Sequence, residues 1–155
     1  MTNQQKIIFK NKLKLICYEI IQQRINGART AIDNAQQTAN SEEKSSAGDK
    51  YETSRAMSHL EKDMHARQLS ENVKELATLH VINVDAVYDR GAPGAFFQCA
   101  GSSFFIAAGL GKLIVEGNPI FFISPHAPLA KILQDKKAGD RFLLKGVETN
   151  ILDVY

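Results

Sequence analysis

The sequence predicts an α+β protein in which an N-terminal antiparallel helical hairpin precedes a small, mostly antiparallel sheet domain with one short helix. Two long amphipathic runs flank a Ser/Gly break at residues 45–48, and no proline interrupts either run. From about residue 85 the pattern changes to short aromatic and β-branched segments separated by Gly, Asn and Pro. We therefore expect a helical hairpin over residues 1–80, a linker over 81–94 and a sheet domain over 95–155.

The first helix is predicted over residues 4–39. Its apolar residues recur at spacings of 4, 3, 4 and 3, which are typical of a helix that packs on a partner helix. This seam consists of Ile21, Ile25, Ala28, Ile32 and Ala35. Gly27 weakens the helix by about 1 kcal/mol relative to Ala but does not end it.

The second helix is predicted over residues 49–79. Two apolar triplets, spaced 3 and 4 and then 4 and 3, mark the face expected to pack on the first helix. The triplets are Met57, Leu60 and Met64, followed by Leu69, Val73 and Leu76. Two helices of about 30 residues extend roughly 45 Å. We therefore expect a long coiled-coil hairpin that is broken at residues 40–47.

Six short segments predict the strands of the sheet, and each is rich in aromatic or β-branched residues. They span residues 96–99, 103–106, 112–115, 120–123, 141–145 and 149–155. Gly117-Asn118-Pro119 predicts a tight turn between the third and fourth strands. Residues 128–134 predict a short helix with Pro128 in its first turn.

Charge is distributed unevenly along the chain, although the formal net charge is only +2. Residues 1–30 hold six basic residues and one acidic residue, whereas residues 40–52 hold four acidic and two basic residues. A basic stem with an acidic end suits a partner that contains nucleic acid. The alternative is a helix face that is charged only because it is solvated.

Simple features exclude or disfavour several classes of protein. The sequence has no run of 18 apolar residues, which excludes a membrane-spanning helix, and its polar start disfavours a signal peptide. Cys17 and Cys99 form no C-x-x-C pair, so we expect buried, reduced thiols and a cytoplasmic protein. The four histidines lack metal-ligand spacing and no serine belongs to a nucleophile motif, so we expect no enzyme that acts alone.

Asp49 and Glu52 are the candidate catalytic and metal-binding residues. They stand three residues apart at the predicted start of the second helix, which places both on nearly the same side. One interpretation is a capping box, in which the two side chains satisfy backbone N–H groups of the helix start. The other is partial coordination of Mg²⁺, which takes one or two protein carboxylates beside water and phosphate. Two carboxylates alone make a weak site, so they would work best by completing a site on another macromolecule.

Three neighbours of these acids are candidates for contact with nucleic acid. Lys50 and Arg55 carry charges that suit phosphate groups, and such contacts do not depend on sequence. A role in surface solubility is the alternative for both. Tyr51 is placed either to stack on a base or to pack over the turn.

The order of these parts, together with two motifs, resembles the Gre family of bacterial transcript-cleavage factors over nearly the whole chain. The tip pattern of that family is Gly-Asp-x-x-Glu-Asn-Ala-Glu-Tyr, and its first five positions match residues 48–52. The C-terminal pattern is roughly Ile-Ser-x-x-Ser-Pro-Leu-Gly or Ala, then Gly-Lys-x-x-Gly-Asp. It is followed, or nearly so, by Ile123, Ser124, Pro128, Leu129, Ala130, Lys137, Gly139 and Asp140.

The resemblance implies an FKBP-like C-terminal domain that docks at the secondary channel of RNA polymerase, while the coiled coil enters the channel. Asp49 and Glu52 then help to bind the second Mg²⁺ of the polymerase, so that water attacks the 3′ region of backtracked RNA. The protein would act as a monomer on the nucleic acid of the elongation complex and share this Mg²⁺ with the polymerase. The implied docking surface comprises Ser124, Pro125, His126, Pro128 and Leu129.

Departures from the family pattern define two alternatives. Thr53-Ser54-Arg55 follows Glu52, so the third acid of the family tip is missing. One alternative is therefore a regulator that binds the secondary channel without stimulating cleavage. The other is a coiled-coil adaptor or dimerisation module that is unrelated to polymerase.

Overall fold

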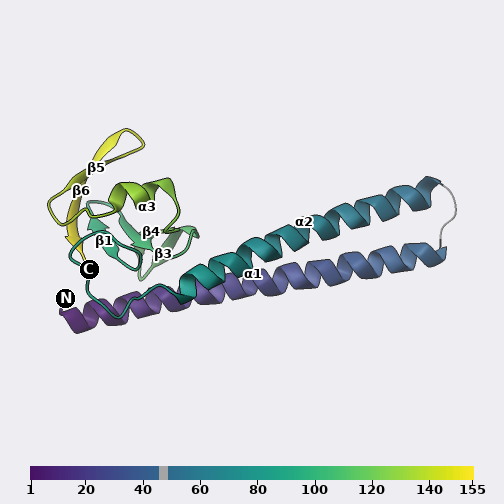
Figure 1. Ribbon diagram of the computed structural model, residues 1–155, viewed down its shortest axis with the longest axis horizontal. Helices are drawn as coiled ribbons and strands as arrows, with labels where there is room; N and C mark the ends of the chain where they lie inside the picture. Colours follow the sequence, from purple (N-terminus) through teal and green to yellow (C-terminus); the bar gives the residue numbers. More distant parts are fainter. Residues whose placement is uncertain (46–48) are drawn as a thin grey trace. The chain divides into compact units, whose positions relative to one another are not determined.

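The computed structural model describes residues 1–45 and 49–155, and the side chains of residues 42–51 lie outside its description. Helix α1 spans Asn3–Ser45 and helix α2 spans Asp49–His80 (Figure 1). The chain divides into two compact units. The helical unit comprises residues 19–76, and the sheet unit comprises residues 1–18 together with 77–155.

Both predicted long helices are confirmed, with one boundary that differs. α2 begins at Asp49 as expected, but α1 continues to Ser45, six residues beyond the predicted end at residue 39. Nothing in residues 40–45 breaks a helix, since the first glycine after Gly27 is Gly48. No helix in the described part of the chain is both long enough and apolar enough to cross a lipid bilayer.

In the helical unit, the predicted seam of α1 is largely confirmed. Ile21, Ile25, Ala28 and Ala35 are all buried, and Ile32 is half-buried. Ala39 extends the same stripe by one further turn. The buried residues of this stripe are isoleucines at positions 21 and 25 and alanines at 28, 35 and 39, so α1 presents a shallower surface beyond Ile25.

The predicted seam of α2 is wrong in its first part and only partly confirmed in its second, where Leu69 and Leu76 are half-buried but Val73 is exposed. Met57, Leu60 and Met64 are 59%, 68% and 45% exposed, whereas Ser58 is buried. Lys62 Nζ donates a hydrogen bond to Gln36 Oε1 of α1 at 2.8 Å, so polar groups line this part of the helix pair. Ser58 therefore lies on the covered face of α2, and the longer Met and Leu side chains point outward.

The sheet unit contains six strands and the short helix α3, which spans Pro128–Leu133. The strands are β1 Phe96–Cys99, β2 Ser103–Ile106, β3 Gly111–Val115, β4 Asn118–Ile123, β5 Arg141–Leu144 and β6 Val147–Val154. Their order across the sheet is β3-β4-β2-β1-β6-β5. β2 and β4 pair in parallel and every other neighbouring pair is antiparallel. The α+β prediction is thus confirmed.

The turn between β3 and β4 lies one residue earlier than predicted. Glu116 and Gly117 both have positive φ, at 52° and 79°, and Val115 pairs directly with Asn118. Positive φ at both central residues is the requirement of a two-residue type I′ hairpin turn. Pro119 therefore lies in β4, before the first residue that pairs with β2.

The two faces of the sheet carry separate apolar layers, because side chains alternate along each strand. On one face, Phe97, Phe104 and Ile106 pack with Leu133 of α3. On the other face, Phe96 contacts Phe9 of α1 with ring centroids 5.3 Å apart, and Phe105 contacts Phe122. Within this unit, the sheet lies between α3 and the first turns of α1.

Residues 81–94 form neither helix nor strand, yet they are firmly attached to the sheet unit. Ile82 and Val84 are buried. Gly91 N donates a hydrogen bond to Lys136 O at 2.7 Å, and Asp135 N donates one to Gly91 O at 2.9 Å. Gly94 N donates to Ile106 O at 2.7 Å. This segment therefore contributes to the core of the unit and is not an exposed tether.

Candidate functional site

The candidate acids occupy the first turn of α2. The helix begins at Asp49, and Glu52 is exposed one turn later. Arg55, another turn along, is exposed as well. The side chains of Asp49, Lys50 and Tyr51 lie outside the described residues, so their predicted roles stay predictions. We refer to residues 49–55 as the tip.

The backbone of the tip bears on both interpretations of the two acids. Residues three apart on a helix lie on nearly the same side, so the backbone of α2 puts positions 49 and 52 on one side of its first turn. Two carboxylates supply only part of the octahedral shell of Mg²⁺. Among the residues that the structure describes, no three His, Cys, Asp or Glu side chains gather as a metal site. A capping role for the same pair remains compatible with this backbone.

The predicted docking residues lie together on one short surface segment, because they are neighbours in the chain. Ser124 Oγ accepts a hydrogen bond from His126 N at 3.2 Å, and Ser124 O accepts one from Ala127 N at 3.0 Å. These bonds form a compact turn between β4 and α3. Pro128 occupies the first turn of α3, where its missing N–H is not needed.

Within this segment, exposure separates the residues that a partner can reach from those that hold the turn. His126 and Pro128 are exposed, whereas Ser124 and Pro125 are half-buried. Leu129 is half-buried and packs against the apolar core beneath α3. His126 and Pro128 therefore offer most of the accessible surface, and Leu129 mainly fixes the helix to the sheet.

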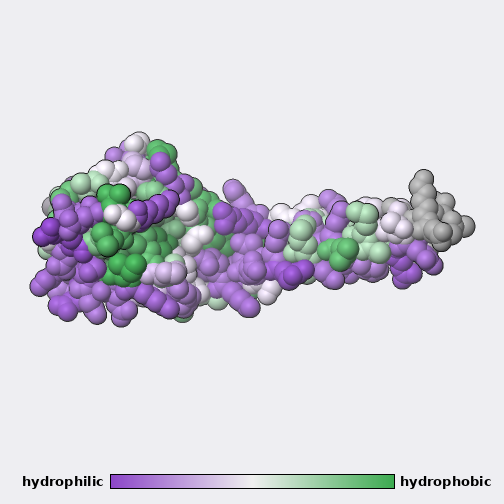
Figure 2. Space-filling view, turned by 90° about the horizontal axis from the view of Figure 1, so that it is seen from above, coloured by the Kyte–Doolittle hydropathy of each residue, from purple (hydrophilic) through white to green (hydrophobic). Residues whose placement is uncertain are grey.

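A small cleft beside Pro125 was not anticipated from the sequence. Its volume is about 120 Å³, and Pro93, Pro125 and Gln134 are among its lining residues. Ile132 of α3, the helix on which this cleft borders, is 48% exposed. The cleft depends on the packing of residues 92–93 against α3, and no pattern in the sequence reports that contact. The space-filling view shows hydrophobic and hydrophilic surface side by side on the sheet unit (Figure 2).

Asp140 and Cys99, both singled out in the sequence, have structural explanations. Asp140 Oδ2 accepts a hydrogen bond from Lys137 N at 2.9 Å, so this acid closes the turn before β5. Cys99 is buried and unbridged, and burial raises the pKa of its thiol to about 11. A thiol with such a high pKa is mostly protonated at neutral pH, so it is a poor nucleophile.

The basic stem predicted from the sequence is largely engaged inside the sheet unit. Lys6 Nζ forms an ion pair with Asp153 at 2.9 Å, and Lys12 forms one with Glu116. Lys14 Nζ donates to Ile82 O at 2.7 Å. Lys10 is fully buried and donates to Ala86 O and Gly94 O at 2.6 and 3.2 Å. These four lysines therefore attach α1 to the sheet unit, and their charge pattern is explained without nucleic acid.

Comparisons of the chain with protein-family models, with curated proteins and with solved structures found no match. The resemblance to the Gre family therefore rests on the sequence motifs given above and on the order of helices and strands.

Proposed function

We propose that the protein is a Gre-like transcription elongation factor that binds bacterial RNA polymerase and presents Asp49 and Glu52 to its catalytic Mg²⁺. One observation carries the proposal: α2 starts at Asp49, and Glu52 is exposed one turn later. α2 is 32 residues long and extends about 48 Å. That length is sufficient to carry the two acids into a deep channel of a larger enzyme.

The chemistry of hydrolysis assigns different roles to this protein and to the polymerase. When bound, Mg²⁺ activates water and stabilises the charge that develops on a phosphodiester during hydrolysis. The carboxylates of Asp49 and Glu52 supply anionic oxygens near this position, and the polymerase supplies the remaining ligands and the RNA. In this proposal, Lys50, Tyr51 and Arg55 contact phosphates or a base of that RNA. The protein is accordingly a factor for the hydrolysis performed by another enzyme.

Docking is assigned to the turn between β4 and α3, with His126 and Pro128 as its most accessible residues. A docking surface on the sheet unit and an acidic pair on the helical unit separate binding from catalysis. Variants of the two regions should therefore have different effects: loss of the acids should leave polymerase binding intact, and loss of docking residues should weaken both binding and cleavage.

The deciding experiment measures cleavage of RNA in stalled, backtracked elongation complexes. The wild-type protein should stimulate cleavage, and both Asp49→Asn and Glu52→Gln should reduce the rate by about tenfold or more, since each removes an anionic metal ligand. Glu61→Gln is the matched control, because Glu61 is an exposed acid of α2 outside the tip. Circular dichroism must accompany the assay, since loss of a cap costs about 0.5–2 kcal/mol.

Two outcomes would redirect the proposal. If the wild-type protein binds polymerase and no cleavage follows, the protein is a secondary-channel regulator, and both acid variants should bind as well as wild type. If it fails to bind polymerase at all, the Gre-like proposal is wrong. His126→Glu tests docking independently, with Lys145→Glu, at the turn between β5 and β6, as its control.

A second candidate function is favoured by the exposed residues of α2. Met57, Leu60 and Met64 form an apolar stripe with helical spacing that α1 does not cover. Such a stripe suits the assembly of a coiled-coil module with a second copy of this chain. Sedimentation of the wild type and of Leu60→Glu tests this function: a dimer abolished by the variant supports it, and a monomer at all concentrations contradicts it.

A further inference from the structure

The cleft beside Pro125 is lined by residues from separate segments of the sheet unit. Pro93 precedes β1, Gln134 directly follows α3, and Pro125 lies in the turn between β4 and α3, which we call the docking turn. The cleft volume of about 120 Å³ lies below the range of small-molecule sites, which begins at about 300 Å³. A space of this size suits a single side chain of a partner protein, as when an anchor residue fills a pocket at an interface.

The floor and much of the wall of the cleft are apolar. Ile106 and Ala130 line it although both are almost completely buried, so they form its floor. Pro93 and Pro125 line it as well, and a proline has no N–H group that needs a polar partner. Ala92 and Ala130 are small, which leaves space between α3 and the segment before β1. The cleft therefore suits an aliphatic side chain, because burial of apolar surface is favourable.

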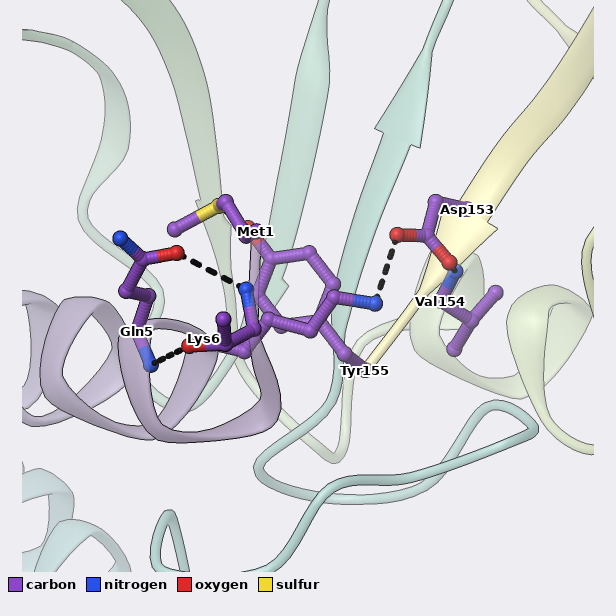
Figure 3. A network of polar contacts seen from close by, with 7 residues as sticks. Met1, Gln5, Lys6, Asp153, Val154 and Tyr155 are labelled. Carbon is purple, nitrogen blue, oxygen red and sulfur yellow. Dashed lines mark hydrogen bonds and ion pairs between the residues drawn. The ribbon is translucent and has the colours of Figure 1, made fainter.

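One charged side chain lies at the edge of this apolar cleft. Among the described residues that line it, Lys131 alone carries a charge, and Lys131 is exposed. Within the described part of the chain, its side chain forms no ion pair or hydrogen bond, and Asp135, four residues further along, does not reach it. Lys6 is a contrast, since Figure 3 shows its side chain passing over the ring of Tyr155 to reach Asp153. Lys131 is therefore available to pair with the carboxylate of a partner.

Gln134 adds hydrogen-bonding groups beside Lys131. The two residues are three positions apart at the end of α3, and both are exposed and line the cleft. The ammonium group of Lys131 only donates hydrogen bonds, whereas the amide of Gln134 both donates and accepts. A carboxylate can therefore accept from Lys131 while Gln134 binds a neighbouring peptide group. A cationic group is disfavoured, because no acidic residue lines the described cleft and Lys131 would repel it.

We propose that the cleft binds an aliphatic side chain of a partner protein in which an Asp or Glu residue stands next to that side chain. The aliphatic group fills the cleft, and the carboxylate pairs with Lys131. The identity of the partner rests on the proposed function, under which it is RNA polymerase, but the chemistry of the cleft does not. Pro125 belongs to both the docking turn and the cleft, so a partner bound at the turn lies beside the cleft.

Titration of the full-length protein with blocked dipeptides tests the chemistry of the cleft without polymerase. N-acetyl-Leu-Glu-amide should bind with a Kd of about 1–10 mM, and the shifted amides in NMR spectra should lie within residues 92–94, 106–107, 124–126 and 130–135. N-acetyl-Leu-Lys-amide and N-acetyl-Ala-Glu-amide should each bind at least about threefold more weakly. The first places a cation beside Lys131, and the second leaves the apolar cleft largely unfilled.

Two variants separate the charge at the cleft from the space within it. Lys131→Glu should weaken binding of N-acetyl-Leu-Glu-amide by about fivefold, whereas Lys131→Arg should keep it within about twofold of wild type. Ala92→Leu should also weaken it by about fivefold, because the larger side chain fills the cleft and leaves the charge unchanged. Lys112→Glu is the matched control, since Lys112 is an exposed residue of β3 that does not line the cleft. Thermal unfolding of each variant shows whether it is folded.

Binding of the same variants to RNA polymerase distinguishes a failure of the cleft assignment from a failure of the proposed function. Lys131→Glu and Ala92→Leu should each weaken polymerase binding by about fivefold, and Lys112→Glu should not. Dipeptide binding without polymerase binding would contradict the proposed function alone.

Three results would overturn the cleft assignment even if the wild type binds polymerase. The first is a Leu-Glu dipeptide that does not bind, or that binds equally to wild type, Lys131→Glu and Ala92→Leu. The second is equal binding of the Leu-Glu and Leu-Lys dipeptides, which would exclude the carboxylate. The third is self-association of the wild type that Lys131→Glu abolishes, since the occupant would then be a second copy of this chain.

Discussion

Lys10 illustrates how a single residue can have a role opposite to the one that its sequence context suggests. In the sequence it is one of the bases of a solvated or nucleic-acid-binding stem, but its side chain is fully buried. Its Nζ lies 4.5 Å from the centroid of the Tyr88 ring and donates to two backbone carbonyls. Burial lowers the pKa of Lys10 to about 8, and the charge of Asp85 opposes this effect only in part.

This depressed pKa predicts a specific dependence of stability on pH. Between pH 8 and the ordinary lysine pKa of 10.5, the unfolded chain retains the Lys10 proton and the folded chain has lost it. The contribution of Lys10 to the free energy of unfolding therefore rises with pH across this window, by up to about 1.4 kcal/mol per unit of pKa difference. Lys10→Met removes this contribution.

Chemical denaturation of wild type and Lys10→Met at pH 7.5, 9 and 10.5 measures the effect. The difference in unfolding free energy between them should move in favour of the wild type as the pH rises. Using this difference cancels the opposing contributions of Cys99 and Tyr155, whose pKa values burial raises to about 11 and about 12. A difference that is constant across the three pH values would show that Lys10 titrates normally in the folded protein.

Two glycines predict opposite outcomes for the same substitution. A Cβ atom at Gly91 would lie 1.8 Å from Leu133 O, whereas one at Gly27 would meet nothing within 4 Å. Gly91→Ala should therefore destabilise the protein by more than about 2 kcal/mol, because backbone must move. Gly27→Ala should stabilise α1 by about 0.5–1 kcal/mol. Thermal unfolding of both variants measures this pair, and equal shifts in Tm would contradict the packing around Gly91.

At the scale of elements, the sequence predicts the strands better than the packing of the helices. Short segments rich in aromatic residues and bounded by Gly and Pro place β1 and β2 at their observed residues. The seam of α2 is mispredicted because an apolar pattern indicates a packed face only if the partner has room for it. Ser58 is buried and Met57 is exposed, and a sequence pattern on one helix does not report the shape of the other.

The corrected seam gives a prediction for the helix pair. Ile25 is buried at 2% exposure, so Ile25→Ala should reduce the free energy of unfolding by about 2–4 kcal/mol. Leu60 is 68% exposed, so Leu60→Gln should change it by no more than about 0.5 kcal/mol. Urea denaturation compares the two variants. A large loss for Leu60→Gln would mean that its face is buried, as it would be in a dimer, and sedimentation of the same sample would identify that case.

Some parts of the candidate site can be predicted from a sequence pattern, and others cannot. The start of α2 at Asp49 follows from the Ser/Gly break and the acidic residue at the start of a helix-forming run. The docking turn follows from Pro128 and the residues before it. The cleft beside Pro125 depends on contacts between residues far apart in the chain, and periodicity within one segment carries no information on it.

At the scale of the whole molecule, stability is distributed unevenly between the two units. In the sheet unit, bulky side chains such as Phe97, Phe104 and Leu133 are almost entirely buried. In the described part of the helical unit, the buried residues beyond Ile25 are small or polar: Ala28, Ala35, Ala39 and Ser58. Because apolar burial contributes roughly 25 cal/mol per Å², the helix pair is held together less strongly toward its tip.

Hydrogen exchange followed by mass spectrometry tests this gradient in the full-length chain. Amides of β1, β2, β4 and β6 should exchange slowest, since they open only when the sheet unit unfolds. Along α1, protection should fall steadily from residues 13–25 to residues 35–41, because local opening requires less apolar surface to be exposed there. Uniform protection along α1 would contradict the gradient and would indicate a partner that covers the helix pair. If Leu60→Glu then restored the gradient, that partner would be a second copy of the chain bound to the exposed stripe of Met57, Leu60 and Met64.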